Sequence, residues 1–139
     1  MGYASSDPAR LVRAGTVRID TAADAVRLIG HDLADAPVEM LWLAHLDNAG
    51  MVLAIEQQMG DAANLPILFR PILRNVCALG TRRLLIAHNH PSGDPTPSQA
   101  DRSATRRLAD LLGAMGVELV DHLVIARRGV ASFRSLGLL

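Results

Sequence analysis

The sequence predicts an α/β fold, a single domain in which a mixed β-sheet is flanked by helices. Three observations support this prediction. The chain has 139 residues, which is long enough for one domain with a substantial core and too short for two comfortable ones. Half of the residues are hydrophobic, as is typical of a globular protein. Apolar segments with helical spacing alternate with short extended runs, and two of these runs are joined by a turn sequence.

The N-terminal part of the chain contains one helix signal. We expect residues 1–15 to form a loosely ordered lead-in and residues 16–139 to form the domain. The segment from Thr21 to Asp24 has the pattern of a helix N-cap, and a short apolar face follows it. Pro37 ends this region because proline cannot continue a helix.

A hairpin is predicted next. The apolar run at residues 38–46 indicates a strand, and the sequence Asp47-Asn48-Ala49-Gly50 is typical of a turn. Residues 51–55 then supply the antiparallel partner strand. Residues 58–66 contain a glycine and a proline and are expected to form a loop.

Strands and helices alternate through the rest of the chain, which favours a sheet with some parallel pairing. Pro71 suits the first turn of a helix, and Gly80 follows the expected end of that helix. The sequence Arg127-Arg128-Gly129 indicates a turn between the last two extended runs. The predicted elements are a helix at 71–79, a strand at 83–87, a helix at 97–113, a strand at 118–126 and a short extended piece at 130–133.

Composition excludes several classes of protein. The formal net charge is zero, so the overall charge does not attract the chain to nucleic acid or acidic lipid. Cys77 is the single cysteine, which excludes an internal disulfide and a Cys-x-x-Cys metal site. No stretch reaches the roughly 18 apolar residues of a membrane span, and the N-terminus lacks the apolar core of a signal peptide. We therefore expect a cytoplasmic protein without membrane contact.

Residues 88–101 contain three side chains of the kinds that bind divalent metals. His88 and His90 follow the apolar run at 84–87, and because side chains alternate along a strand, both imidazoles point to the same side. A loop rich in proline and glycine turns the chain back, and Asp101 falls in the first turn of the next helix. Two imidazoles and one carboxylate leave one position of a tetrahedral zinc open, as in catalytic sites. The sequence thus predicts one Zn²⁺ held by these three residues.

Asp101 also has a simpler interpretation. The pattern Ser98-x-x-Asp101 is close to a capping box, and the same pattern occurs at Thr21 and Asp24, where no His-x-His precedes it. Alone, the pattern favours a cap. The preceding His-x-His favours a ligand, because two neutral imidazoles side by side fill a core poorly. Asp94 is a rival carboxylate, but its place in the middle of the loop favours a turn.

The spacing resembles that of a known family. His88-x-His90, seven residues, Ser98, two residues and Asp101 match the JAMM motif of JAB/MPN-domain metalloproteases. The run His-Asn-His-Pro-Ser-Gly-Asp-Pro-Thr-Pro-Ser is similar to the RadC branch of that family. Weaker matches lie at 121–125 and 132–134. The resemblance covers roughly residues 20–139 and implies a JAB/MPN-type domain with a cytidine-deaminase-like architecture.

The resemblance also implies a reaction. JAMM enzymes use an upstream glutamate as general base toward a metal-activated water. The chain has three glutamates, and Glu39 stands at the start of the first core strand, where the family places its base. Without the resemblance, Glu39 would be an ordinary carboxylate at a strand edge. Ser98 would help to hold the developing oxyanion. The expected activity is zinc-dependent hydrolysis of an amide or isopeptide bond in a peptide or protein.

Departures from the RadC branch leave two alternatives. The usual Pro-Arg-Glu before the second helix is replaced by Phe69-Arg70-Pro71, and Ser135 stands where a glutamate is usual. A non-catalytic MPN-type binding module is favoured by these losses and disfavoured by the intact ligand set. A DNA-repair or DNA-processing role rests on the family label alone, and the neutral charge argues against nucleic-acid binding by this chain. The sequence does not indicate an oligomeric state.

Other residues have simpler predicted roles. His122 is expected to be a structural histidine with a satisfied hydrogen bond. His45 has no partner in the sequence pattern and is expected on the sheet face or in solvent. Cys77 is expected to be a small core residue. Three arginines that follow the loop are expected to lie on a solvated helix face, and this is favoured over binding of a carboxylate or phosphate: Arg102, Arg106 and Arg107.

Overall fold

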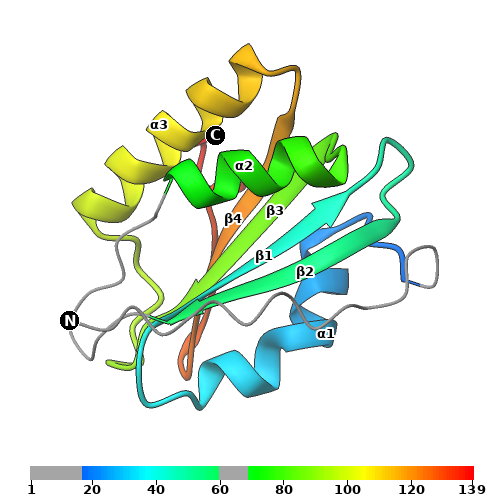
Figure 1. The fold of residues 1–139 in the computed structure, drawn as a ribbon. Helices are drawn as coiled ribbons and strands as arrows, with labels where there is room; N and C mark the ends of the chain where they lie inside the picture. The colour runs from blue at the N-terminus through cyan, green and yellow to red at the C-terminus, as the bar shows by residue number, and fades with distance from the viewer. Residues whose placement is uncertain (1–16, 60–68) are drawn as a thin grey trace.

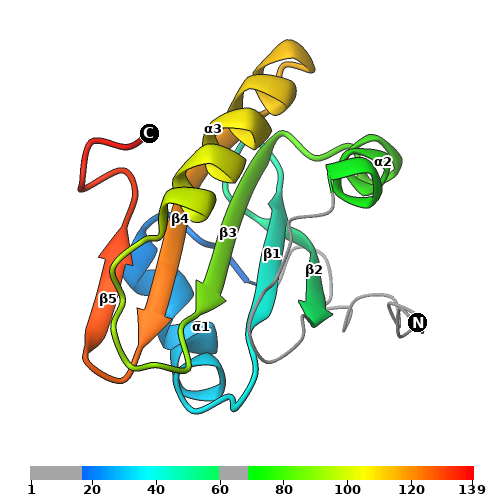
Figure 2. The ribbon, with the colours of Figure 1, turned by 90° about the vertical axis from the view of Figure 1, so that its left-hand side faces the viewer.

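A computed structural model describes residues 17–59 and 69–139. Its centre is a five-stranded sheet with the strand order β2-β1-β3-β4-β5. Helix α1 (Ala22–Ala34) covers one face, while α2 (Phe69–Leu79) and α3 (Gln99–Ala114) cover the other (Figures 1 and 2). This arrangement confirms the predicted α/β domain with a mixed sheet and flanking helices.

The sheet combines antiparallel and parallel pairing. β1 pairs antiparallel with β2 and β3, β3 pairs parallel with β4, and β4 pairs antiparallel with β5. The parallel pair needs a crossover, and α3 provides it. The strands are β1 (Met40–Leu46), β2 (Val52–Met59), β3 (Arg83–Asn89), β4 (Glu118–Ala126) and β5 (Gly129–Ser132).

The central strands are apolar on both faces, because helices cover the sheet on both sides. In β1, Trp42 packs on the α1 side, whereas Leu43 packs on the side of α2 and α3. In β3, Leu85 and Ile86 are divided in the same way. The alternation places His88 on the side of α3 and leaves Asn89 pointing toward α1. Burial of each large side chain stabilises the fold by roughly 1.5–3 kcal/mol.

Both predicted helix caps are present as capping boxes. In α1, the Thr21 hydroxyl accepts from the backbone N–H of Asp24, and the Asp24 carboxylate accepts from the backbone of Thr21. Ser98 and Asp101 make the same reciprocal pair at the start of α3. The second box matters for function because it orients one of the candidate metal ligands.

Several predicted boundaries are wrong by a few residues. β1 begins at Met40 rather than at residue 38, because the Val38 carbonyl accepts from the Asn89 side chain. β2 continues to Met59, so residues 58 and 59 belong to a strand, and the rest of the predicted loop lies outside the described residues. The lead-in predicted at 1–15 also lies outside them. β3 continues through Asn89, and α2 begins at Phe69.

One predicted burial state is wrong, and the two alternatives for His45 are resolved. Cys77 is exposed, because α2 buries the face that carries Ile72 and Val76, and the side chain of Cys77 lies off that face. His45 lies on a sheet face, as one of its two interpretations allowed, but it is fully buried and not in solvent. Its Nδ1 lies 2.7 Å from the Thr81 hydroxyl. Within the described ranges, none of the helices has the length and apolar character that a membrane span requires.

Candidate metal centre

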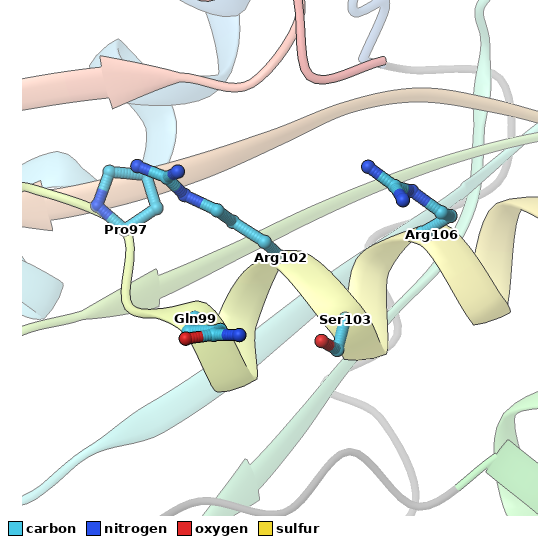
Figure 3. A pocket seen from close by; sticks show the side chains of 5 residues that line it. All are labelled: Pro97, Gln99, Arg102, Ser103 and Arg106. Atoms are coloured by element: carbon cyan, nitrogen blue, oxygen red, sulfur yellow. The ribbon is translucent and has the colours of Figure 1, made fainter.

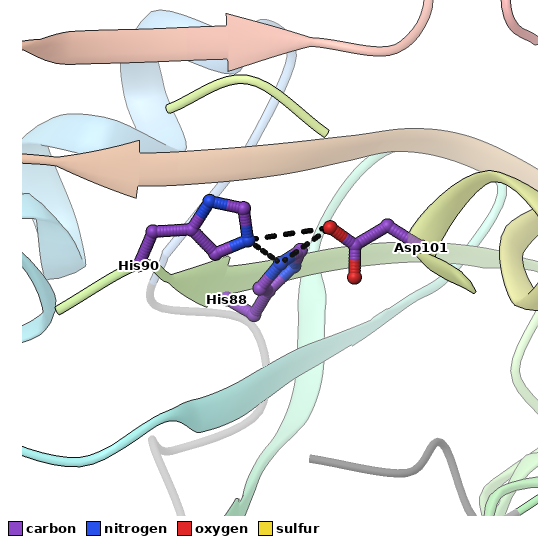
Figure 4. A group of neighbouring side chains, drawn as sticks. All are labelled: His88, His90 and Asp101. Atoms are coloured by element: carbon purple, nitrogen blue, oxygen red, sulfur yellow. Dashed lines mark hydrogen bonds and ion pairs between the residues drawn. The ribbon is translucent and has the colours of Figure 1, made fainter. Parts of the chain in front are cut away.

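The three predicted metal ligands converge at the carboxyl end of β3 (Figure 4). The Nε2 atoms of His88 and His90 lie 3.0 Å apart. The Asp101 Oδ2 atom lies 3.4 Å from the Nε2 of His88 and 3.2 Å from that of His90. The period of the strand turns both imidazoles to one side, and the first turn of α3 brings the carboxylate back to them.

The spacing of these donor atoms fits a tetrahedral zinc. Bonds of about 2.0–2.1 Å at tetrahedral angles place two donors about 3.3 Å apart. The three observed separations are 3.0, 3.2 and 3.4 Å. Two imidazole nitrogens and one carboxylate oxygen are also a common donor set of zinc sites that keep a position open for water or substrate.

Asp101 is both a helix cap and a candidate ligand. Its Oδ2 accepts from the backbone N–H of Ser98 at 2.8 Å, and its own N–H donates to the Ser98 hydroxyl at 3.0 Å. The two interpretations of the sequence are therefore compatible, because the cap holds the carboxylate toward the histidines. Burial acts to raise the pKa of this carboxyl, but the neighbouring imidazoles of His88 and His90 and the backbone N–H of Ser98 outweigh it and hold the pKa far below its ordinary range.

His90 is held by the backbone of the loop that follows it. Its Nδ1 lies 2.8 Å from the Asp94 carbonyl oxygen, which can only accept, so Nδ1 carries a hydrogen, and in the neutral ring Nε2 keeps its lone pair. Asp101 raises the pKa of His90 because its carboxylate can accept a hydrogen bond from Nε2 of the protonated ring, and the charge of Glu39 adds to the effect. The Asp94 carboxylate accepts from the backbone and hydroxyl of Thr96, so Asp94 forms a turn, as predicted.

His122 is the buried neighbour of His88. Its Nε2 lies 2.6 Å from the Nδ1 of His88, and its Nδ1 lies 2.6 Å from the Thr105 hydroxyl. Its ring stacks on Phe133 at a centroid distance of 4.5 Å. Burial lowers the pKa of His122 well below its ordinary value, so the ring is neutral at pH 7. The predicted structural histidine is thus in contact with a candidate ligand, and the motif at 121–125 was the sequence signal for it.

Glu39 lies at the same end of the sheet, directly before β1, and is half-buried. It is close enough for its charge to raise the pKa of His90. The other two glutamates lie elsewhere. Glu56 contacts His45 at 3.3 Å, and Glu118 lies beside Arg83 at the opposite end of β3.

Asn89 braces the segment that carries Glu39, and sequence reasoning missed it. Its Oδ1 accepts from the Met40 N–H at 2.7 Å, and its Nδ2 donates to the carbonyls of Val38 and Ala36 at 2.9 and 3.3 Å. The available signal was the polar side chain between two histidines, which must point away from both of them on a strand. One strand end therefore presents candidate ligands on one face and supports the candidate base from the other.

A cleft of about 470 Å³ lies along the outer face of the first two turns of α3 (Figure 3), whereas the Asp101 carboxylate on the same helix faces His88 and His90. Two of the three arginines that the sequence placed on one helix face line it, whereas Arg107 lies over the Phe69 ring. The five residues that line the cleft are Pro97, Gln99, Arg102, Ser103 and Arg106. They offer hydrogen-bond donors but no carboxylate.

Comparison with known proteins places the chain in a family. Residues 19–138 match the RadC-like JAB domain. A UPF0758 protein of Rhodobacter capsulatus is 39% identical over 108 residues, which are 77% of this chain and 50% of that protein. A UPF0758 protein of Neisseria meningitidis serogroup B is 37% identical over 122 residues, which are 86% of this chain and 52% of that protein. The chain spans about half the length of the curated relatives it matches. It belongs to the RadC-like JAB domain family.

Proposed function

We propose that this chain is a zinc-dependent hydrolase of the JAMM type that cleaves an amide or isopeptide bond in a peptide or protein. His88, His90 and Asp101 would hold one Zn²⁺. The observation that carries the proposal is the convergence of three donor atoms, each within 3.4 Å of the others, at one strand end. Membership of the JAB domain family supports the class of reaction.

The side chains around the site suit this chemistry. When bound, zinc supplies a Lewis acid and makes water a usable nucleophile near neutral pH. Glu39 would accept the proton of the water and return it to the leaving amine, which metal alone cannot do. The Ser98 hydroxyl oxygen accepts from the N–H of Asp101, and its own hydrogen is free to donate to an oxyanion.

A non-catalytic binding module is the second candidate. It is favoured by the replacement of the usual glutamates at Pro71 and Ser135. The intact donor set supports the hydrolase instead. A DNA-processing role has only the family name in its favour, and a formal net charge of zero gives no general attraction to nucleic acid.

The test begins with bound metal. Elemental mass spectrometry of the chain, purified without added metal, should give close to one zinc per chain, and the His88→Ala variant should lose it. Absence of zinc from the parent, even after zinc is supplied, would contradict the hydrolase proposal and favour the binding module.

The catalytic step is tested by Glu39→Gln. This variant keeps the shape of the side chain and removes its basicity, so zinc should stay bound while hydrolysis falls by about 10²–10⁴-fold. The substrates are a library of quenched fluorescent peptides and isopeptide-linked peptides. Undiminished hydrolysis in the variant would remove Glu39 from the role of base.

A further inference from the structure

We infer that Thr105 and His122 join the candidate ligands Asp101 and His88 in one hydrogen-bond circuit, and that this circuit presents the Nε2 lone pair of His88 to the metal. The inference rests on the proposed zinc site. Thr105 and His122 would be positioning residues, since neither of them belongs to the group of side chains that would bind the metal. The partners of each hydrogen bond in the circuit fix its direction.

The hydroxyl proton of Thr105 has one acceptor, the backbone carbonyl of Asp101. The Thr105 Oγ1 lies 2.6 Å from the backbone carbonyl oxygen of Asp101, one helical turn earlier. Two oxygens come this close only with a proton between them, and a carbonyl has none to give. Thr105 therefore donates its single hydroxyl proton to Asp101.

The second step follows at His122. Because the hydroxyl proton of Thr105 is already used, Oγ1 can only accept from the Nδ1 of His122 at 2.6 Å. Both residues are fully buried, so water does not offer another partner. A neutral imidazole has one N–H, so the Nε2 of His122 is an acceptor.

The third step reaches the candidate ligand. The Nε2 of His122 lies 2.6 Å from the Nδ1 of His88, which must then carry a hydrogen and donate it. A neutral His88 with its hydrogen on Nδ1 has a bare Nε2. That atom is the one that faces His90 and Asp101. The circuit starts at the Asp101 backbone and ends beside the Asp101 carboxylate.

In this circuit α3 has two roles. It supplies the candidate ligand Asp101 and, four residues later, the Thr105 hydroxyl, which selects the tautomer of His122 and through it that of His88. Without that hydroxyl, the Nδ1–H of His122 has no acceptor in the circuit. His122 would then move its hydrogen to Nε2 and donate to His88, whose own hydrogen would occupy the Nε2 that the metal needs. Loss of such outer partners typically lowers metal affinity by about 10–100-fold.

The experiment compares Thr105→Val with Thr81→Val. Thr81 is a matched control, because it is also a buried threonine with its hydroxyl 2.7 Å from the Nδ1 of a buried histidine, His45. Zinc affinity is measured by competition with a chromophoric chelator. The tautomer of His88 is measured by ¹⁵N NMR of the metal-free protein.

Thr105→Val should lower zinc affinity by about 10–100-fold and move the hydrogen of His88 from Nδ1 to Nε2. Thr81→Val should change neither, and Thr105→Ser, which keeps the hydroxyl, should retain both parent properties. Equal zinc affinity in the two valine variants would overturn the inference. So would a hydrogen on the Nε2 of His88 in the parent.

The tautomer measurement also separates this inference from the proposed function. If the parent binds no zinc, the proposed hydrolase fails, but the NMR spectrum of the metal-free parent still decides whether the circuit exists. If Thr105→Val does not fold, the spectra of the parent and of Thr105→Ser give the same decision.

Discussion

At the scale of single residues, Asn89 shows how one strand end serves two purposes. Its neighbours on both sides are candidate ligands that face α3, so the pleat sends the Asn89 amide toward the connection between α1 and β1. There it makes three hydrogen bonds to backbone groups between Ala36 and Met40. Glu39 lies within this braced segment, which holds the candidate base beside the candidate metal ligands.

We predict that Asn89→Ala separates catalysis from metal binding. Loss of the amide frees the segment that carries Glu39 and leaves the three candidate ligands in place, so kcat should fall more than tenfold while zinc affinity changes by less than about threefold. The free energy of unfolding should fall by about 1–3 kcal/mol, because part-buried backbone groups lose their partners.

Asn75→Ala is the matched control for this prediction. The Asn75 amide donates to Glu56, away from the site, so its removal should leave kcat unchanged. Equal losses of kcat in the two variants would show that Asn89 acts only through general stability.

At the scale of elements, the two helix caps form a natural comparison. Each capping box satisfies free N–H groups at the start of its helix, but only the second includes a candidate ligand. The same local sequence pattern therefore has two different consequences, which depend on what lies beside the helix start.

We predict that Thr21→Ala and Ser98→Ala have similar effects on stability and different effects on the site. Each should lower the free energy of unfolding by about 1 kcal/mol and the melting temperature by about 4 °C. Only Ser98→Ala should also lower zinc affinity, because the Asp101 backbone N–H loses the Ser98 hydroxyl and the helix start that carries the carboxylate is held less firmly. Thermal unfolding and chelator competition measure the two effects, and a weakened zinc site in Thr21→Ala would contradict the prediction.

The exposed face of α3 carries two arginines that the proposed substrate would meet where it extends past the site. Arg102 and Arg106 line the cleft on this outer face. Among the described residues, neither has an acidic partner within ion-pair distance, whereas Arg18, Arg27 and Arg83 do. Two such cations would favour a carboxylate in the part of a substrate that lies along the outer face of α3.

We predict that Arg102→Gln combined with Arg106→Gln lowers kcat/KM about tenfold for peptides with an acidic side chain several residues from the cleavage site, as expected for the loss of roughly 1.4 kcal/mol of charge-assisted hydrogen bonding. Neutral peptides should be cleaved as before. Arg82→Gln is the control, since Arg82 precedes the amino end of β3. An equal loss for neutral peptides would contradict a role in selectivity.

At the scale of the whole molecule, burial of His122 links folding to pH. Burial lowers the pKa of His122 in the folded protein, so the unfolded chain takes up a proton first as the pH falls. The contribution of neutral His122 to the free energy of unfolding is therefore complete above the pKa of histidine in the unfolded chain, about 6.5, and is lost as the pH falls below that value.

We predict that lowering the pH from 7.5 to 5 destabilises the metal-free parent more than it destabilises metal-free His122→Phe. The Phe side chain does not titrate and keeps the stacking on Phe133. Urea unfolding at each pH measures the difference, and parallel slopes for the two proteins would show that His122 does not contribute.

Much of the fold and the site could be predicted because their signals are local. The capping boxes, the turn after β1, the His-x-His and Asp101 are all encoded within a few residues. Contacts between distant segments could not be predicted. Asn89 meets Met40 across 49 residues of sequence, and Thr105 meets His122 across 17. The same limit explains why the prediction for Cys77 was wrong, because its burial depends on which face of α2 meets the sheet.

The distribution of site residues along the chain has a consequence for how this domain can change during evolution. The three candidate ligands lie within fourteen consecutive residues, at 88–101, while Glu39 comes from a segment in the first third of the chain. Substitutions at 36–40 would remove the candidate base and leave the candidate ligands unchanged. Under the proposed function, a hydrolase and a metal-binding domain without activity would therefore differ by a few substitutions in that segment, with the same fold.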